Sequence, residues 1–240
     1  MEAIEMAPLL HMVLLGLAMA VVAIQDARAQ TATPPSVAGN IHAVIYVEVM
    51  PTSRANSVAI LNRYREATRR DNGNLRCEVV SRIGQGHQFA ILEIWRDQPA
   101  FETHQNSASA KTLREQIQPI RIAPIDERVH IGISLGPLEP GPGGDAIYVV
   151  THVDVVPPRK DDGLAAVKQL AELSRTAPDN ARFEVVQQTN RPNHFTVVEI
   201  WRSARAVEAH SMAEPTRRFR DALGPMSGAL YDERLFKLVE

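Results

Sequence analysis

Apolar positions recur along the chain in a fixed order of strand-like and helix-like stretches. Runs rich in β-branched side chains, bounded by Pro, Gly and Asn, are typical of strands. Apolar residues spaced three or four apart between Pro51 and Arg70 predict a helix after the first strand. The further segments predicted in this way are strands near 41–49, 75–83, 88–96 and 125–133, and a helical stretch over 98–118 that ends at Pro119.

A shift of 106 residues repeats this order without a gap, so that 41–134 superimposes on 147–240. The letters EIWR at 93–96 recur at 199–202, and further along the chain His104 falls on His210. Such self-similarity at a fixed period marks an internal duplication. Residues 41–134 are called the first copy below, and residues 147–240 the second copy.

Each copy has the order β-α-β-β-α-β of a ferredoxin-like unit, whose helices cover one face of a four-stranded antiparallel sheet. Residues of both parities are apolar in 88–96, so the other face also needs burial. Two such sheets packed face to face satisfy this need. We therefore predict an α+β protein in which the two copies form a pseudo-dimeric α+β barrel within one chain.

The sequence outside the copies divides into three segments. Residues 135–146 are rich in Gly and Pro and form a predicted linker, and 30–40 form a similar tether. Residues 1–29 resemble a secretory signal peptide, with an apolar run over 9–24 and a small-x-small cleavage site, Ala27-Arg28-Ala29. The two Glu residues at the start depart from the usual basic region. An uncleaved membrane anchor is the alternative, although the apolar run is shorter than the roughly 20 residues that a span needs.

Charge and cysteine content exclude several classes of protein. A net charge of −2 with a sequence pI of about 6.5, and no long run of one sign, is not typical of a nucleic-acid-binding surface. Cys77 is the only cysteine, so no intramolecular disulfide forms, and its apolar surroundings predict a buried, inert thiol. The chain has no CxxC or HExxH spacing, and we expect no metal site.

A strand that ends in E-x-W, followed nine residues after the Trp by a helical His, resembles the antibiotic biosynthesis monooxygenase family. The resemblance extends over both copies. It implies paired ferredoxin-like units and an activity on phenolic or quinol-type substrates with O2 and without a cofactor, although many members have no demonstrated activity. The residues that characterise the haem-degrading branch of this family are absent, because its key positions hold Ile45, His104 and Arg114 here. The resemblance thus disfavours haem breakdown, and we expect no cofactor.

Alternation along the strand places Glu93 and Trp95 on one face, as it does Glu199 and Trp201 in the second copy. On the functional interpretation, each Trp forms an aromatic wall of a substrate pocket and each Glu lies inside it. The alternative is core packing by the Trp, with the Glu paired to an Arg.

His104 and His210 are the predicted catalytic residues, because an imidazole near neutral pH can take a proton from a phenol. An electron-rich phenolate then reacts with O2, provided that donors stabilise the developing oxyanion. The alternative is a structural His that packs against the Trp or closes a helical turn.

Four further residues are predicted to contact the substrate. Arg114 and Arg220 recur at equivalent positions and can hold an anionic oxygen, unless they form solvated salt bridges. Tyr46 can donate to a bound oxygen, and His152, its equivalent, can act as a base. Such differences indicate that one copy kept a working pocket, and the sequence leaves open which one.

The sequence thus predicts an exported, periplasmic or secreted monooxygenase of small aromatic or quinol compounds, with O2 as its second substrate and a homo-oligomer as an open possibility. Two alternatives remain at this point. One is a non-catalytic protein that sequesters a hydrophobic small molecule, and the other is a structural barrel without a ligand. A base within reach of an apolar pocket would favour the enzyme.

Export makes a direct prediction about the N-terminus. We expect the mature protein to begin at Gln30, because cleavage follows Ala29. Mass spectrometry of the chain purified from its own host measures this. An intact Met1 in the cytoplasmic fraction would contradict export.

Overall fold

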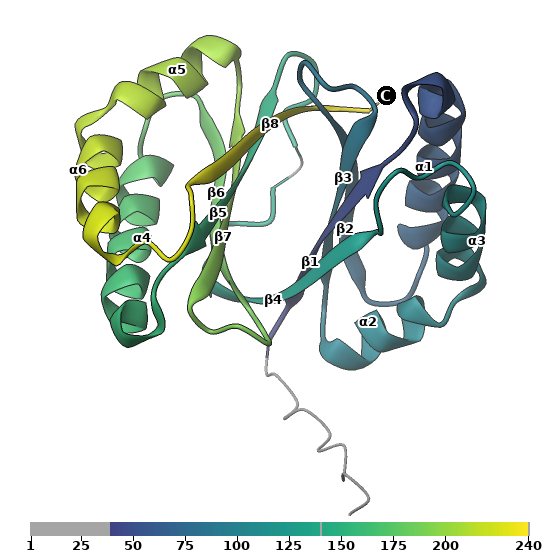
Figure 1. The fold of residues 1–240 in the computed structure, drawn as a ribbon, viewed down its shortest axis with the longest axis horizontal. Coiled ribbons are helices and arrows are strands. Elements are labelled where there is room, and N and C mark those ends of the chain that lie inside the picture. The colour runs from purple at the N-terminus through teal and green to yellow at the C-terminus, as the bar shows by residue number, and fades with distance from the viewer. Residues whose placement is uncertain (1–38, 140, 240) are drawn as a thin grey trace, which may run out of the picture. The chain divides into compact units, whose positions relative to one another are not determined.

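The computed structural model describes residues 39–139 and 141–239. The predicted signal segment, 1–29, and the tether up to residue 38 lie outside the described residues. Within the described ranges, no helix is long and apolar enough to cross a membrane. Both copies follow the predicted β-α-β-β-α-β order (Figure 1).

The first copy begins with strand β1 and ends with strand β4. Its elements are β1 (Ile41–Glu48), the short helix η1 (Pro51–Ser53), α1 (Arg54–Thr68), β2 (Asn74–Arg82), β3 (Gln88–Trp95), α2 (Gln98–Gln105), α3 (Ala108–Ile117) and β4 (Asp126–Ser134). The turn between α1 and β2 needs a left-handed residue, which Gly73 supplies with φ of 88°. Asp179 takes the same role in the second copy with φ of 61°.

The second copy repeats these elements at the 106-residue shift. They are β5 (Ile147–Asp154), η2 (Pro157–Arg159), α4 (Lys160–Arg175), β6 (Asn180–Gln188), β7 (His194–Trp201), α5 (Ala204–Met212), α6 (Glu214–Leu223), η3 (Gly224–Met226) and β8 (Asp232–Leu238). The predicted helical stretch is divided in both copies. In the first, the Ser107 hydroxyl caps α3 by accepting from the Ala110 amide at 3.2 Å. In the second, Ala213 is extended and Pro215 lies in the first turn of α6.

The eight strands form one closed antiparallel barrel in the order β1-β3-β2-β8-β5-β7-β6-β4. Each copy contributes four neighbouring strands, and the helices of each copy cover the outside of its own strands (Figure 1). The sequence predicted that the two sheets face each other, and the structure adds that their edges also pair. Strand β2 pairs with β8, and β4 pairs with β6, so each copy satisfies the edge strands of the other.

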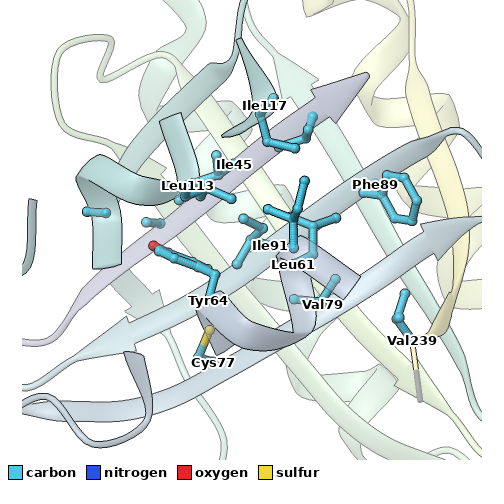
Figure 2. Close-up of a cluster of buried hydrophobic side chains, with 14 of the residues drawn as sticks. Ile45, Leu61, Tyr64, Cys77, Val79, Phe89, Ile91, Leu113, Ile117 and Val239 are labelled. Carbon is cyan, nitrogen blue, oxygen red and sulfur yellow. The ribbon is translucent and has the colours of Figure 1, made fainter. Parts of the chain in front are cut away.

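Strands β1, β3, β5 and β7 bury side chains on two opposite faces. Odd-numbered residues of β1 and β3 pack under the helices, where Leu61 and Tyr64 of α1 lie over Cys77, Val79 and Ile91 (Figure 2). Cys77 is fully buried, as predicted, and burial raises the pKa of its thiol well above the usual value. Even-numbered residues point into the barrel lumen. The apolar part of the lumen consists of Val44, Val80, Ala90, Leu92, Ala146, Tyr148, Val150, Val198, Ile200 and Phe236.

A buried ion network joins the two copies inside the lumen. The Arg182 guanidinium contacts the Glu78 carboxylate of the first copy and the Glu184 carboxylate of its own copy, each at 2.8 Å. The Tyr148 hydroxyl donates to Glu78 at 3.1 Å. All four side chains are at least nine-tenths buried, so each charge depends on its partners for the solvation that water would otherwise provide.

A second set of hydrogen-bonded polar side chains crosses the lumen. At each of its positions the two copies hold different residues. The Tyr46 hydroxyl lies 2.6 Å from Nε2 of His152, whose Nδ1 lies 3.0 Å from the Thr196 hydroxyl. That hydroxyl lies 2.9 Å from Nε2 of His130. Burial lowers the pKa of His130 to about 4 and that of His152 to about 3. Both imidazoles are therefore neutral at pH 7.

The buried, neutral histidines of this hydrogen-bonded set predict a loss of stability at acid pH. Unfolded His130 takes up a proton near pH 6.5 but folded His130 only near 4, so its contribution to the free energy of unfolding falls as pH drops through this window. The loss amounts to roughly 3 kcal/mol for this residue.

The control variant combines His130→Phe with Thr196→Ala, which are the residues that the other copy has at these positions. We expect urea denaturation at pH 7.0 and 4.5 to show a smaller acid loss in this variant than in the wild type. The raised pKa of Glu199 acts in the opposite direction but is common to both proteins. Equal losses would contradict the role of His130.

Candidate functional site

The predicted Trp–His pair comes together in both copies, between the sheet and the outer helices. In the first copy, Trp95 ends β3 and His104 lies in the last turn of α2, with ring centroids 4.5 Å apart and planes 30° from parallel. In the second copy, the rings of Trp201 and His210 stack at 4.4 Å and 28°. The imidazole therefore lies directly on the indole, so the Trp face that the functional interpretation made the wall of a substrate pocket is covered by the His ring.

The first copy holds a complete network of buried hydrogen bonds around this pair. The Trp95 indole donates to Oε2 of Glu93 at 2.9 Å, and the Tyr64 hydroxyl donates to Oε1 of Glu93 at 2.6 Å. That hydroxyl also lies 2.8 Å from Nε2 of His104, whose Nδ1 lies 2.7 Å from an Asp71 carboxylate oxygen. The core-packing interpretation had assumed that Glu93 pairs with an Arg. In the structure Glu93 pairs instead with Trp, Tyr and His side chains.

The second copy keeps the frame of this network and loses two of its members. The Trp201 indole donates to Oε2 of Glu199 at 2.7 Å, and Nε2 of His210 lies 3.6 Å from the same oxygen. Leu170 stands in place of Tyr64, and Ala177 stands in place of Asp71. The imidazole and the carboxyl therefore lack the hydroxyl and the carboxylate that fix their counterparts in the first copy.

Burial dominates the electrostatics of the second copy. It raises the pKa of Glu199 to about 8, against the opposing effect of the Trp201 N–H. Burial and the nearby Arg220 lower the pKa of His210 to about 4. At pH 7 the carboxyl is mostly protonated and the imidazole is neutral. The distance of 3.6 Å between them therefore describes a neutral pair and not an ion pair. In the first copy, burial likewise raises the pKa of Glu93.

A small cavity opens beside Glu199 and His210. Its enclosed volume is about 10 Å³, which is room for about one water molecule. Its lining consists of Val149, Leu170, Glu199, Val207, His210, Ser211, Thr216, Arg220, Tyr231 and Glu233. The Thr216 hydroxyl lies 3.4 Å from Nε2 of His210. The cavity thus combines an acid–base pair with a hydroxyl and a guanidinium.

The two predicted arginines have different surroundings. Arg220 lines the cavity, where it donates to the Ser211 carbonyl at 3.2 Å and to the Glu233 carboxylate at 3.3 Å. Its equivalent, Arg114, is exposed and donates to the Gln105 carbonyl at 2.8 Å. The geometry therefore permits an anion-binding role for Arg220, and it gives Arg114 a helix-capping contact.

Tyr46 and His152 lie on the lumen side of the sheet, opposite to the Trp–His pairs. They face each other across the two copies, and Tyr46 lines a pocket of about 160 Å³ together with Arg82 and Arg234. The Arg234 guanidinium lies 4.5 Å from the centre of the Tyr46 ring. The structure therefore does not bring these two predicted residues into the strand–helix site.

Sequence reasoning missed Asp71, Thr216 and Tyr231. Asp71 lies in a DNGN turn, and its contact with His104 spans two helices that the sequence could not orient. The available signal was the mismatch at the 106-residue shift, where Asp71 meets Ala177, as Tyr64 meets Leu170. Among the residues of 39–139 and 141–239, no group of three or more His, Cys, Asp or Glu side chains is placed to hold a metal ion.

Comparison with known proteins identifies the class to which this fold and site belong. The sequence model described as "Antibiotic biosynthesis monooxygenase" matches residues 40–116 and again residues 146–222. The two matches cover more than half of the chain, and the chain therefore belongs to the antibiotic biosynthesis monooxygenase family, as a tandem duplication.

Individual relatives agree with this assignment. The "Putative monooxygenase YcnE" of Bacillus subtilis (strain 168) is 24% identical over 81 residues, which is 34% of this chain and 85% of that protein. A solved structure described as a "Putative monooxygenase" of Fusobacterium nucleatum superimposes with a TM-score of 0.76 at 15% identity, covering 84% of this chain and 93% of that one.

An "anthrone oxidase-like protein" superimposes with a TM-score of 0.69 at 15% identity, over 84% of this chain and 92% of that one. At these identities the two solved structures establish the tandem barrel fold alone.

Proposed function

We propose that the protein is an exported, cofactor-independent monooxygenase that oxidises small phenolic or quinol compounds with O2. The observation that carries the proposal is the buried pair of Glu199 and His210, which lies against the Trp201 indole and borders a cavity. Membership of the antibiotic biosynthesis monooxygenase family supports the reaction class. The apolar run over 9–24, with its small-residue site, supports export.

The first step is removal of the substrate's hydroxyl proton. Triplet O2 reacts slowly with a neutral closed-shell phenol, whereas the phenolate is electron-rich. A base is most effective when the pKa of its conjugate acid lies near the working pH. With a pKa of about 8, the Glu199 carboxylate meets this condition better than His210, with a pKa of about 4. We therefore assign the proton to Glu199 and a hydrogen bond on the hydroxyl oxygen to His210.

The oxidation balances without an added reductant. A hydroquinone and O2 yield a hydroxyquinone and water: one oxygen atom enters the ring in place of a hydrogen, and the other leaves as water. Hydroxylation supplies two electrons, and conversion of the quinol to the quinone supplies the other two. The Arg220 guanidinium, which lines the cavity, stabilises negative charge on the substrate oxygen.

Oxygen uptake tests this activity. Purified mature protein should consume O2 with a panel of hydroquinones and without added flavin, haem or metal, at a rate above that of the buffer. His210→Ala should lower turnover about a hundredfold, because the substrate oxygen loses a hydrogen-bond donor. The far-ultraviolet circular dichroism spectrum of this variant should match that of the wild type, which shows that it is folded at the assay temperature. Quinol binding without O2 uptake would show the sequestering alternative, and neither binding nor uptake would show the structural one.

The pH profile identifies the base. The active form of the free enzyme carries ionised Glu199, so kcat/KM for a hydroquinone should rise with pH to a plateau above about 8. Glu199→Gln keeps the shape of the side chain and the hydrogen bond to Trp201 but removes the base. The residual activity of this variant should therefore not rise with pH in this range. A profile with its only step near 4 would assign the base to His210 instead.

A further inference from the structure

A phenol already occupies the site of the first copy, and it belongs to the chain itself. The hydroxyl of Tyr64 lies between the Glu93 carboxyl, at 2.6 Å, and Nε2 of His104, at 2.8 Å. These are the distances at which phenolic hydroxyls form strong hydrogen bonds. The ring of Tyr64 comes from α1, lies over the sheet and is 5% exposed (Figure 2). The first copy therefore shows how its carboxyl–imidazole pair holds a phenol.

The second copy presents the same pair without that phenol. Leu170, at the position of Tyr64, offers no polar atom to Glu199 or His210. Glu199 keeps the Trp201 N–H, and His210 has the Thr216 hydroxyl at 3.4 Å as its nearest hydroxyl partner. Both groups retain hydrogen-bonding capacity, on the side where the cavity lies.

The site of the second copy is also more accessible to solvent than that of the first. The side chains of His104 and Glu93 are 1% and 0% exposed, whereas those of His210 and Glu199 are 9% and 7% exposed. The guanidinium of Arg220 lines the cavity of the second copy, while Arg114 is exposed and contacts Gln105. The carboxyl–imidazole pair of the second copy is therefore the more accessible of the two. In the first copy, a cavity of about 220 Å³ borders Tyr64 between α1 and α3, and the Tyr64 ring separates it from Glu93 and His104.

We propose that the second copy alone binds and turns over substrate, with the substrate hydroxyl between Glu199 and His210, as Tyr64 lies between Glu93 and His104. Tyr64 is an internal substrate mimic that keeps the first copy closed. Leu170 is the residue that leaves the second copy open. This inference rests on the proposed function for its chemistry, although its geometry concerns binding alone.

The size of the cavity sets a condition on entry. Its volume of about 10 Å³ accommodates the hydroxyl group and not the ring. Tyr231 lies at the cavity and its side chain is partly exposed. Entry of the ring therefore displaces Tyr231 towards solvent, where Leu230 next to it is already 94% exposed.

Two reciprocal variants of the full-length mature chain test the inference. Leu170→Tyr introduces into the second copy the phenol that closes the first, and Tyr64→Leu removes that phenol from the first copy. The binding probe is 4-nitrophenol, which O2 does not oxidise, measured by equilibrium dialysis. Turnover is measured as O2 uptake with a hydroquinone.

The wild type should bind one 4-nitrophenol per chain. Leu170→Tyr should abolish this binding and lower turnover at least tenfold, whereas Tyr64→Leu should raise the stoichiometry above one. Full binding and turnover in Leu170→Tyr would overturn the inference, as would two bound probes in the wild type.

Folding and function are separated by two further measurements. The melting temperature of Leu170→Tyr should equal or exceed that of the wild type, because the new hydroxyl gains two buried partners. Should this variant not fold, His210→Ala decides: retained stoichiometric binding of 4-nitrophenol overturns the inference. The wild type could bind 4-nitrophenol, lose this binding in Leu170→Tyr, and yet consume no O2. That result would contradict the proposed oxidation, and it would still support the second copy as the open one.

Discussion

The structure depends on one constraint, which is that each four-stranded sheet is apolar on both faces. Helices cover the outer face, and the inner face of one copy is buried only by the inner face of the other. Closure through β2–β8 and β4–β6 also removes the free edges that open sheets expose. The linker therefore joins two units that cannot bury their surfaces alone, and it makes their association intramolecular.

Joining the copies in one chain also permits asymmetry across the pseudo-two-fold axis. In a symmetric dimer a residue near the axis meets its own copy, whereas here Tyr46 meets His152 at 2.6 Å. A Tyr and a neutral His form a matched donor and acceptor, which two copies of one residue provide less well. His130 and Thr196 extend this hydrogen-bonded chain, and the equivalent residues, Phe236 and Ala90, are apolar. The lumen is thus specialised by coordinated differences between the copies.

Much of the fold could be predicted from the sequence, because the duplication supplied each element twice and alternation assigned the faces of the strands. The pairing of Trp95 with His104 followed from local spacing alone. The contacts of Tyr64 and Asp71 did not, because they depend on how α1 and the turn after it lie against α2. Nor could spacing show that Tyr46 and His152 face the lumen together, since this depends on the register between the two copies. The division of the helical stretch at Ser107 was missed because a single capping hydroxyl decides it.

One frame of Trp, Glu and His acquires two chemical characters through its neighbours. A buried carboxyl is costly when ionised, and its cost is offset only by groups that hydrogen-bond to the charged form. Around Glu93, a tyrosine and a histidine with its own carboxylate partner saturate the hydrogen bonds and seal the side chains from solvent. Around Glu199, one indole N–H remains as a hydrogen-bond donor, and burial raises the pKa of this carboxyl to about 8. Burial raises the pKa of the carboxyl in both copies, so the copies do not differ in the direction of this shift. Loss of the tyrosine in the second copy instead empties the place of a phenol hydroxyl beside a carboxyl whose pKa allows it to exchange a proton with one.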